Sequence, residues 1–350
     1  MTDSVGKVMT VLGAVEPDRL GFTLMHEHLY LDLRKNHLPD PDLTPAERAV
    51  WEADLDLSNL HLARRALPLL DNYVLDSEDD AIAEVSHFKS LEGQTIVDVT
   101  SRGLGRDPEA LKKASMATGV NIVMGSGWYQ KVFHPDDMDS RSVETLTDEI
   151  VHDVTVGVGD FTENIRSGII GEIGVNGNPI TDNEVRSVRA AARASLLTGA
   201  SISFHSPQLK HEKHDVLDIV EDEGADLTRT ILGHSCAMAD DVPFMLELLS
   251  RGVYVQFDTL GVVRTSEEPA RDHQVAAAIP QLIDAGYGDR ILLSQDVCWK
   301  SHLKMYGGSG YTYIQETFLP YLGALGVSDE AQQQIMVENP MRVLTLVSPQ

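Results

Sequence analysis

Six side chains that can bind a metal ion or move a proton stand where short apolar runs of this 350-residue chain end. His26 and His28 lie two positions apart in MHEHL, and residues two apart on an extended strand face the same side. The other four are Glu172, His205, His234 and Asp296, which follow one another at intervals of 33, 29 and 62 residues. These intervals correspond to one, one and two strand–helix units, so we expect all six residues at one end of a parallel sheet.

Imidazole and carboxylate donors without a thiolate suit divalent ions such as Zn, Co, Mn or Fe(II). Six donors are too many for one catalytic ion that keeps an open position, so we predict two divalent ions per chain, with Zn first. Glu172 lies in the apolar run GIIGEIG, where an unpaired buried carboxylate is costly unless it bridges two cations. The alternative is a mononuclear site of the deaminase type, which would leave Glu172 without a role.

Eight short apolar or β-branched runs are separated by amphipathic segments with helical spacing. The expected strands are 22–29, 94–100, 120–126, 168–174, 200–205, 229–234, 252–258 and 290–296, and the clearest helices are 78–92, 142–158, 183–198, 240–250 and 273–285. Near-continuous apolar strands that alternate with helices predict a parallel sheet covered by helices. Eight units favour a closed (β/α)₈ TIM barrel, and no G-x-G-x-x-G follows the first run to support an open dinucleotide-binding sheet.

Two segments do not follow this alternation of strands and helices. Residues 31–77 form a long insertion after the first strand, with Pro39 and Pro41, and we expect it to cover the site or contact another subunit. The C-terminal part, 311–347, is typical of two helices that close the barrel, with a break at Asn339–Pro340. We expect residues 1–350 to form one domain.

The charge balance excludes several classes of partner. There are 28 basic and 54 acidic residues, a net charge of −26, and such a surface repels nucleic acid and anionic lipid. Two cysteines suit a reducing compartment, and the N-terminus lacks the pattern of a signal peptide, so we expect a cytoplasmic protein. The expected partners are a small-molecule substrate and a second copy in a homodimer.

The six candidate ligands lie in stretches that resemble the phosphotriesterase family of the amidohydrolase superfamily, over nearly the whole chain. The stretches are MHEHL, GIIGEIG, SISFHSP, ILGH, LLSQD, YGGSGYTYI and VENPMRVL. The resemblance implies a barrel with a binuclear centre. It assigns His26, His28 and Asp296 to the more buried metal, His205 and His234 to the more exposed metal, and the bridge to a side chain of the fourth strand.

Two features differ from the best-known members of that family. Their bridge is a carboxylated lysine, whereas this chain has no lysine between 132 and 209 and carries Glu172 at that place, as in the phosphotriesterase-related branch. The family's lactonases resemble FDRYG, whereas this chain has FDTLG at 257–261, with Thr259 in place of the arginine. These differences argue against efficient organophosphate hydrolysis and against a simple acyl-homoserine lactonase.

The predicted reaction is hydrolysis by a metal-bridging hydroxide, with Asp296 as the residue that accepts its proton. A lactone or carboxylic ester is the first substrate class, an N-acyl amide the second, and a phosphotriester at most a side activity. A protein that kept the barrel but only binds a ligand is the remaining alternative, and the complete set of metal ligands argues against it.

The residues expected to surround the metals and contact the substrate are assigned from their positions in the sequence. Tyr129 in GSGWYQ matches the family's G-T-G-x-Y, in which the phenol projects over the metals, although packing at the barrel mouth explains it equally well. The expected substrate-binding residues are Trp128, Trp299, Arg264, Lys300 and Lys304. The alternatives are loop packing for the two tryptophans and surface ion pairs for the three cations.

Some neighbouring residues are expected to have no part in catalysis. Cys298 should line the pocket without acting as a nucleophile, and Arg102 and Arg106 should anchor the loop after the second strand by pairing with carboxylates. Apart from His302, the histidines outside the metal set are expected at the surface.

Overall fold

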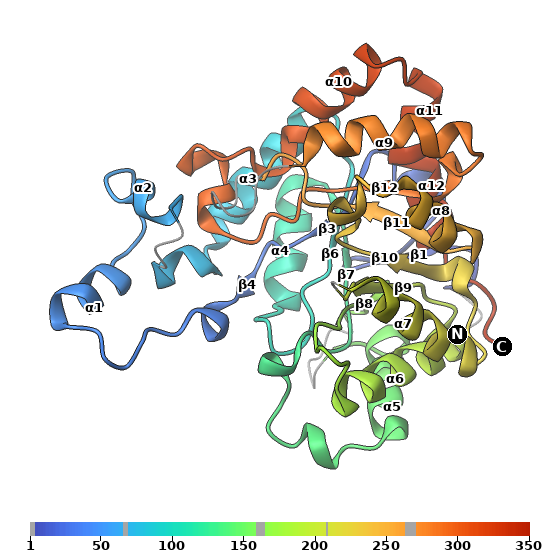
Figure 1. Ribbon diagram of the computed structural model, residues 1–350, viewed down its shortest axis with the longest axis horizontal. Helices are drawn as coiled ribbons and strands as arrows, with labels where there is room; N and C mark the ends of the chain where they lie inside the picture. The colour runs from blue at the N-terminus through green and yellow to red at the C-terminus, as the bar shows by residue number, and fades with distance from the viewer. Residues whose placement is uncertain (1–3, 66–68, 159–164, 208, 263–270) are drawn as a thin grey trace.

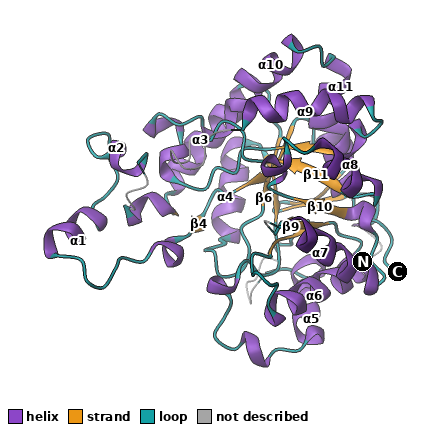
Figure 2. Ribbon diagram, in the orientation of Figure 1, coloured by secondary structure: helices purple, strands orange, loops and turns teal. Residues whose placement is uncertain are grey.

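The computed structural model describes residues 4–65, 69–158, 165–207, 209–262 and 271–350 and contains the expected barrel (Figures 1 and 2). Its parallel strands are β3 (Thr23–Glu27), β6 (Thr95–Asp98), β7 (Asn121–Met124), β8 (Ile170–Gly174), β9 (Ile202–His205), β10 (Thr230–Leu232), β11 (Tyr254–Phe257) and β12 (Ile291–Leu293). They pair in the orders β3-β6-β7 and β8-β9-β10-β11-β12.

Hydrogen bonds join these two sheets into a closed barrel. Between β7 and β8, the Gly171 amide donates to the Ser126 carbonyl at 2.6 Å. Between β12 and β3, the His26 amide donates to Ser294 Oγ at 2.9 Å, and the Asp296 amide donates to the His26 carbonyl at 3.2 Å. The (β/α)₈ fold predicted from the sequence is confirmed.

Helices cover the outside of the barrel between successive strands. They are α3 (Glu78–Ser90), α4 (Pro108–Thr118), α5 (Val143–Thr155), α6 (Asp182–Thr198), α7 (Lys210–Asp222), α8 (Val242–Ser250) and α9 (Asp272–Asp284). Ser77, Asp107, Ser142 and Thr181 cap four of them by accepting a hydrogen bond from a first-turn amide. Among the described residues, no helix is long and apolar enough to cross a membrane.

The N-terminal end of the barrel is filled by apolar side chains. The hairpin β1 (Val8–Thr10) and β2 (Gly13–Val15) contributes Val8, and α12 (Asn339–Leu344) contributes Val343 and Leu344. They pack with inward-facing strand residues such as Met25 and Leu292 in one buried cluster. This end is a packed core, so the opposite end is where a site can open.

The insertion after the first barrel strand stands to one side of the barrel mouth (Figure 1). It contains β4 (Leu31–Asp32) paired with β5 (Val74–Leu75), the short helices α1 (Pro45–Trp51) and α2 (Leu60–Ala63), and a 3₁₀ turn at Arg34–His37. Lys300 anchors it, because its ammonium lies 2.5 Å from a carboxylate oxygen of Asp71.

The C-terminal region forms two helical stretches, as predicted, but the expected break at Asn339–Pro340 is wrong. The first stretch runs through a π-helix (Ile314–Phe318) into α10 (Leu319–Ala324). The second runs from α11 (Asp329–Gln333) through a π-helix (Gln334–Glu338) into α12. Pro320 and Pro340 each come just after a π segment. The wider π turn does not need the backbone N–H hydrogen bond that a proline cannot donate.

The loop after β6 is anchored by a buried carboxylate, as the sequence predicted for Arg102 and Arg106. Asp153 of α5 lies 2.7 Å from Arg102 Nη2 and 3.1 Å from Arg106 Nη1, and it accepts a hydrogen bond from Ser126 Oγ at 2.8 Å. Asp153 and Arg106 are almost fully buried. The three partners therefore hold the loops after β6 and β7 against α5.

Replacing Asp153 with Ala should lower the free energy of unfolding by about 3–5 kcal/mol, because it leaves buried guanidinium charge without its partner. Urea unfolding followed by circular dichroism measures this change. Lys113→Ala, which breaks the exposed pair with Glu78, is the control and should leave the midpoint unchanged. Equal midpoints for the two variants would show that the Asp153 cluster does not stabilise the fold.

Candidate metal centre

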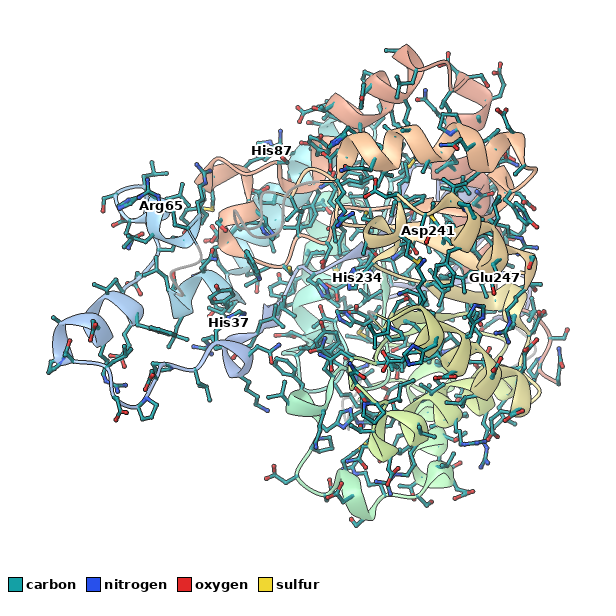
Figure 3. The ribbon with its side chains drawn as sticks, in the orientation of Figure 1. His37, Arg65, His87, His234, Asp241 and Glu247 are labelled. Carbon is teal, nitrogen blue, oxygen red and sulfur yellow. The ribbon has the colours of Figure 1, made fainter. Side chains whose placement is uncertain are left out.

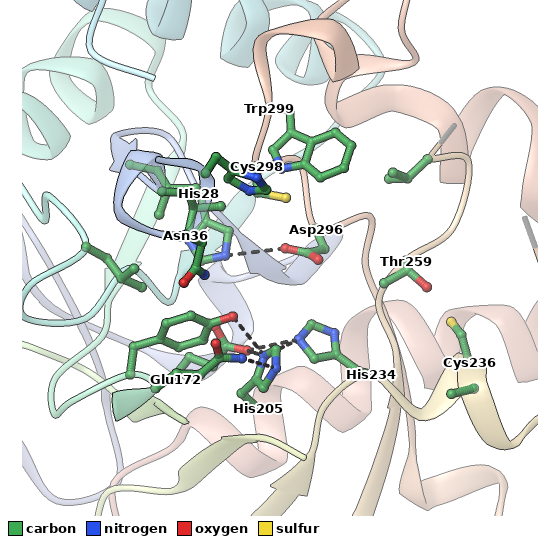
Figure 4. Close-up of a pocket in the computed structure, with 18 of the residues that line it drawn as sticks. His28, Asn36, Glu172, His205, His234, Cys236, Thr259, Asp296, Cys298 and Trp299 are labelled. Atoms are coloured by element: carbon green, nitrogen blue, oxygen red, sulfur yellow. Dashed lines mark hydrogen bonds and ion pairs between the residues drawn. The ribbon is translucent and has the colours of Figure 1, made fainter. Parts of the chain in front are cut away.

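A cavity of about 410 Å³ opens at the carboxyl ends of the barrel strands (Figure 4). Five of the six predicted ligands line it, namely His28, Glu172, His205, His234 and Asp296. The sixth, His26, is fully buried beneath them. Figure 3 places His234 within the barrel, whereas Arg65 and Glu247 lie at the periphery. The strand topology thus brings the residues of five different strand ends to one place.

Three of the imidazoles converge on the Glu172 carboxylate. Glu172 Oε1 lies 2.8 Å from His205 Nδ1, 3.0 Å from His234 Nε2 and 3.7 Å from His26 Nε2. On the other side, Asp296 Oδ1 lies 3.4 Å from His28 Nε2 and 3.7 Å from His26 Nε2. His26 and Glu172 therefore lie between two groups of candidate ligands. Asp296 is on one side of them, and His205 and His234 are on the other.

This donor set fits divalent metal ions. Three groups have ligand atoms within 4.8 Å of one another: His26, His28 and Glu172; His26, His234 and Asp296; and Glu172, His205 and His234. His26 Nε2 is buried and has no hydrogen-bond partner, and such an atom is costly unless something binds it. The nitrogen and oxygen donors, with no thiolate among them, match the ligands of Zn and similar ions.

A second ring of polar groups orients the imidazoles. Asp258, at the end of β11, is fully buried and lies 3.0 Å from His234 Nδ1 and 3.3 Å from His26 Nδ1. Thr100 Oγ1 lies 2.9 Å from His28 Nδ1. With the Nδ1 atoms bound in this way, the Nε2 atoms of His26, His28 and His234 face the centre and remain available for metal.

Asp258 also stabilises an uncommon backbone conformation. His234 and Asp296 both have φ of 53°, in the left-handed region that residues other than glycine seldom adopt. The His234 amide donates to both carboxylate oxygens of Asp258, at 3.0 and 2.9 Å. Strained positions of this kind cost about 1–3 kcal/mol and persist where the surrounding structure holds them, often at functional sites.

Glycines next to Glu172 allow the strands to approach closely. A Cβ on Gly171, which has φ of 144°, would lie 2.5 Å from the Ser203 carbonyl oxygen. A Cβ on Gly174 would lie 2.3 Å from the Gln130 amide nitrogen. Larger residues at either place would push β8 away from its neighbours and move Glu172 out of reach of the histidines.

The electrostatics of the centre keep Glu172 ionised. Burial acts to raise the pKa of Glu172, but the neighbouring His26 and His205 and the hydrogen bonds from His205 and His234 hold it well below its usual range. Burial, together with the charge of His234, lowers the pKa of His205, so this ring favours its neutral form. An ionised carboxylate and a neutral imidazole are the forms that bind metal.

Tyr129 and Gln130, which follow β7, both contact His205. The Tyr129 hydroxyl lies 3.1 Å from His205 Nδ1, and the Gln130 side-chain amide lies 2.7 Å from His205 Nε2. If Nδ1 binds a metal, Nε2 carries the proton and the Gln130 amide must present its oxygen to it. Tyr129 lines the cavity, beside the centre over which the resemblance placed it.

The residues that we expected to bind substrate differ in whether they line the cavity. Trp299 lines the cavity, whereas Trp128 is buried and packs against the Arg102 guanidinium. Lys300 pairs with Asp71 and Lys304 with Glu316, and neither lines the cavity. Arg264 lies outside the described residues. This placement does not support a substrate-binding role for Trp128, Lys300 or Lys304.

Cys298 and Cys236 both line the cavity, and neither forms a disulfide. Burial raises the pKa of Cys236 to about 12, so this thiol stays protonated. A protonated thiol is a poor nucleophile.

Several residues of the cavity differ from what the sequence predicted or have no signal in it. His37 was expected at the surface, but it lines the cavity and stacks on Tyr73 with ring centroids 3.5 Å apart. Asn36, Gln130 and Arg271 line the cavity as well. They come from a 3₁₀ turn of the insertion, from the segment after β7 and from the residue before α9, where no periodicity reveals a direction. Asp258 had a usable signal, a carboxylate at the end of an apolar strand run.

A barrel that gathers four imidazoles and two carboxylates at the carboxyl ends of its strands defines a metal-dependent hydrolase. The sequence model of the phosphotriesterase family matches residues 6–344, and the chain belongs to this family.

The chain is also similar to named relatives and to solved structures. It is 34% identical to an N-acetyltaurine hydrolase of Dictyostelium discoideum, over 99% of this chain and 100% of that one. A resiniferatoxin-binding protein from Rhodobacter sphaeroides is 40% identical with a TM-score of 0.89, over 97% of this chain and 95% of that one. A lactonase from Listeria monocytogenes is 25% identical with a TM-score of 0.79, over 98% and 100% of the two chains.

Replacing Asp258 with Ala should weaken metal binding by about 10- to 100-fold, because His26 and His234 lose the partner that orients them. Competition with a chromophoric chelator measures the affinity. Asp258→Asn keeps a hydrogen-bond acceptor without the charge, so its metal affinity should fall between those of the wild type and the Ala variant. Asp218→Asn, at an exposed site, is the matched control. Wild-type affinity in the Ala variant would remove Asp258 from the metal centre.

Proposed function

We propose that this hydrolase cleaves the N-acyl amide of a small amine that carries an acidic group. The observation that carries the proposal is Arg271, the one Lys or Arg side chain that lines the cavity within the described part of the chain. Its partner Asp240, 3.0 Å away, is 63% exposed. An exposed pair of this kind is worth only about 0–1 kcal/mol, so a substrate anion can replace Asp240 at the guanidinium.

The relatives support the amide over the ester. The sequence alone favoured a lactone or carboxylic ester, with the amide second. A relative matched along the whole chain is named for N-acetyltaurine, an amide whose amine part ends in a sulfonate. Such a substrate needs a hydrolytic centre for its acyl group and a cation for its far end, and one cavity of this chain has residues suited to both.

The proposed metal centre uses the six ligands in two groups. His26, His28 and Asp296 would hold one divalent ion, His205 and His234 the other, and Glu172 would bridge them. Two such ions, with Zn first among the candidates, would polarise the acyl oxygen and lower the pKa of a bound water.

The remaining steps belong to side chains of this protein. As the water oxygen bonds to the acyl carbon, Asp296 accepts the proton on a carboxylate oxygen. It then gives this proton to the amide nitrogen as the C–N bond breaks, so the amine leaves neutral. Tyr129 donates a hydrogen bond to the acyl oxygen from beside His205, and Trp299 and His37 exclude water from one wall of the cavity.

A lactone or ester is the second candidate, and the Listeria lactonase, which shares the fold along the whole chain, favours it. The same residues would serve it, with Asp296 protonating an alkoxide instead of an amine. Thr259, which lines the cavity, stands where the family's lactonases resemble FDRYG, so a lactone substrate would have to bind without that arginine. Phosphotriester hydrolysis would be a side activity of either enzyme.

The proton-transfer role of Asp296 is tested by Asp296→Asn. This variant should lower kcat by roughly 10²–10⁴, the usual range for losing general acid–base help. Metal content, measured by mass spectrometry on the same samples, must stay close to that of the wild type for the comparison to count; Asp296→Glu keeps the carboxylate and should recover part of the rate. An Asn variant with full metal content and unchanged kcat would assign the proton to another group.

The substrate class is tested with two matched amides, N-acetyltaurine and N-acetylethanolamine, which differ in the group at the far end. The wild type should show the higher kcat/KM for the anionic amide. Arg271→Gln should lower kcat/KM for N-acetyltaurine by about tenfold or more and leave N-acetylethanolamine nearly unchanged, since one charge-assisted hydrogen bond is generally worth that factor.

Lys304→Gln is the matched control for that experiment, because it removes a cation that pairs with Glu316 and does not line the cavity. It should behave as the wild type towards both amides. If Arg271→Gln lowers both amides equally, Arg271 does not bind the acidic group. If neither amide is hydrolysed while a lactone is, the second candidate replaces the first.

A further inference from the structure

A second cavity, of about 370 Å³, lies at the end of the barrel opposite the metal centre. Its walls come from residues just before β10 and β12, from the first residue of β11 and from the C-terminal segment. They are Asp226, Thr228, Arg229, Tyr254, Arg290, Arg342, Val347, Ser348 and Gln350. Figure 1 shows the C-terminus at the edge of the barrel away from the insertion that borders the active-site cavity. Nothing in the proposed reaction uses this cavity.

Three arginines line this second cavity, although the chain has a net charge of −26. Arg229 is 8% exposed, and its Nη2 donates to the carbonyls of Val343 at 2.8 Å and Thr345 at 2.9 Å. Its Nε is buried and has no hydrogen-bond partner. A buried guanidinium with an unused donor is unusual, because buried polar groups are nearly always paired.

The other two arginines are held in place but only loosely neutralised. The Arg290 guanidinium lies over the Tyr254 ring, 5.0 Å from its centre. Arg342 Nη1 donates to the Asp289 carbonyl at 3.1 Å. Arg290 Nε and Arg342 Nη1 each lie 3.8 Å from the same carboxylate oxygen of Asp289, beyond hydrogen-bond distance.

The carboxylate side chains around the cavity balance these charges only in part. Asp289 is shared between two guanidinium groups at long range, and Asp226 accepts a hydrogen bond from the Thr228 amide at 2.8 Å. Among the described residues, no close ion pair joins Asp226 to the three arginines, although the charge of Asp226 acts on Arg229. Three guanidinium groups face two carboxylate side chains, which leaves an excess of one positive side-chain charge at the cavity of an otherwise acidic protein. The aromatic contact and the carbonyl bonds fix the directions of the guanidinium groups.

We propose that this cavity binds a small dianion of the phosphate type, either inorganic phosphate or a phosphorylated metabolite. Planar guanidinium groups bind phosphate oxygens with paired hydrogen bonds, and three of them around one cavity suit an ion with two negative charges. The volume admits an anion larger than phosphate alone. The proposal does not depend on the substrate assigned to the metal centre.

Calorimetric titration with inorganic phosphate at low ionic strength tests this site on the metal-loaded protein. The metal centre can also bind phosphate, so the wild type should bind up to two per chain, and metal-stripped wild type should keep one. Arg290→Gln/Arg342→Gln should lose that remaining site, with its Kd raised at least tenfold for each guanidinium removed. Arg229 is left unchanged because it holds the C-terminal segment.

Arg48→Gln/Arg65→Gln is the matched control, since it removes two charges from the insertion, whose helices α1 and α2 lie on the other side of the molecule from the C-terminus (Figure 1). It should bind phosphate as the wild type does. Titration with glycerol 3-phosphate separates the two sources: tighter binding than phosphate indicates a phosphorylated metabolite, and equal or weaker binding indicates the free ion. Metal-stripped wild type that binds no phosphate, or an Arg290/Arg342 variant that binds as tightly as the wild type, would overturn the proposal.

Discussion

The metal centre depends on one interaction, the convergence of three imidazoles on a buried carboxylate. Glu172 is 2% exposed, and its Oε1 lies within 3.7 Å of nitrogen atoms from His26, His205 and His234. An isolated carboxylate in such a place would be several kcal/mol too costly to stay charged, so hydrogen-bonding or metal-binding partners must surround it. Each partner comes from a different strand, and the barrel must close before they can meet.

The surrounding structure serves to keep those partners in position. Asp258 binds two of the rings and the backbone of His234 in its left-handed conformation, and the glycines beside Glu172 let β8 sit close to β7 and β9. At the other end of the barrel, the β1–β2 hairpin and α12 fill the interior with apolar side chains. One end is thus closed for stability, and the open end carries the chemistry of a phosphotriesterase-family hydrolase.

The sequence predicted the fold and the convergence of the six candidate ligands, because strand ends in a barrel lie on one rim whatever their separation along the chain. Loops obey no such rule. Lys300 was assigned to the substrate, but its partner Asp71 lies 229 positions away in the insertion, and no local pattern connects them. His37 reaches the cavity from a 3₁₀ turn and Arg271 from the residue before α9, and no sequence pattern predicts either position. Asn339–Pro340 indicated a break because a π segment cannot be recognised from sequence.

The central claim is that Glu172 bridges two divalent ions, and anomalous X-ray scattering from crystals grown with zinc or cobalt tests it most directly. If Glu172 bridges two ions, two peaks per chain should appear, each within about 2.0–2.2 Å of a Glu172 carboxylate oxygen, with His26 and His28 at one and His205 and His234 at the other. A single peak, or two peaks of which only one contacts Glu172, would contradict it.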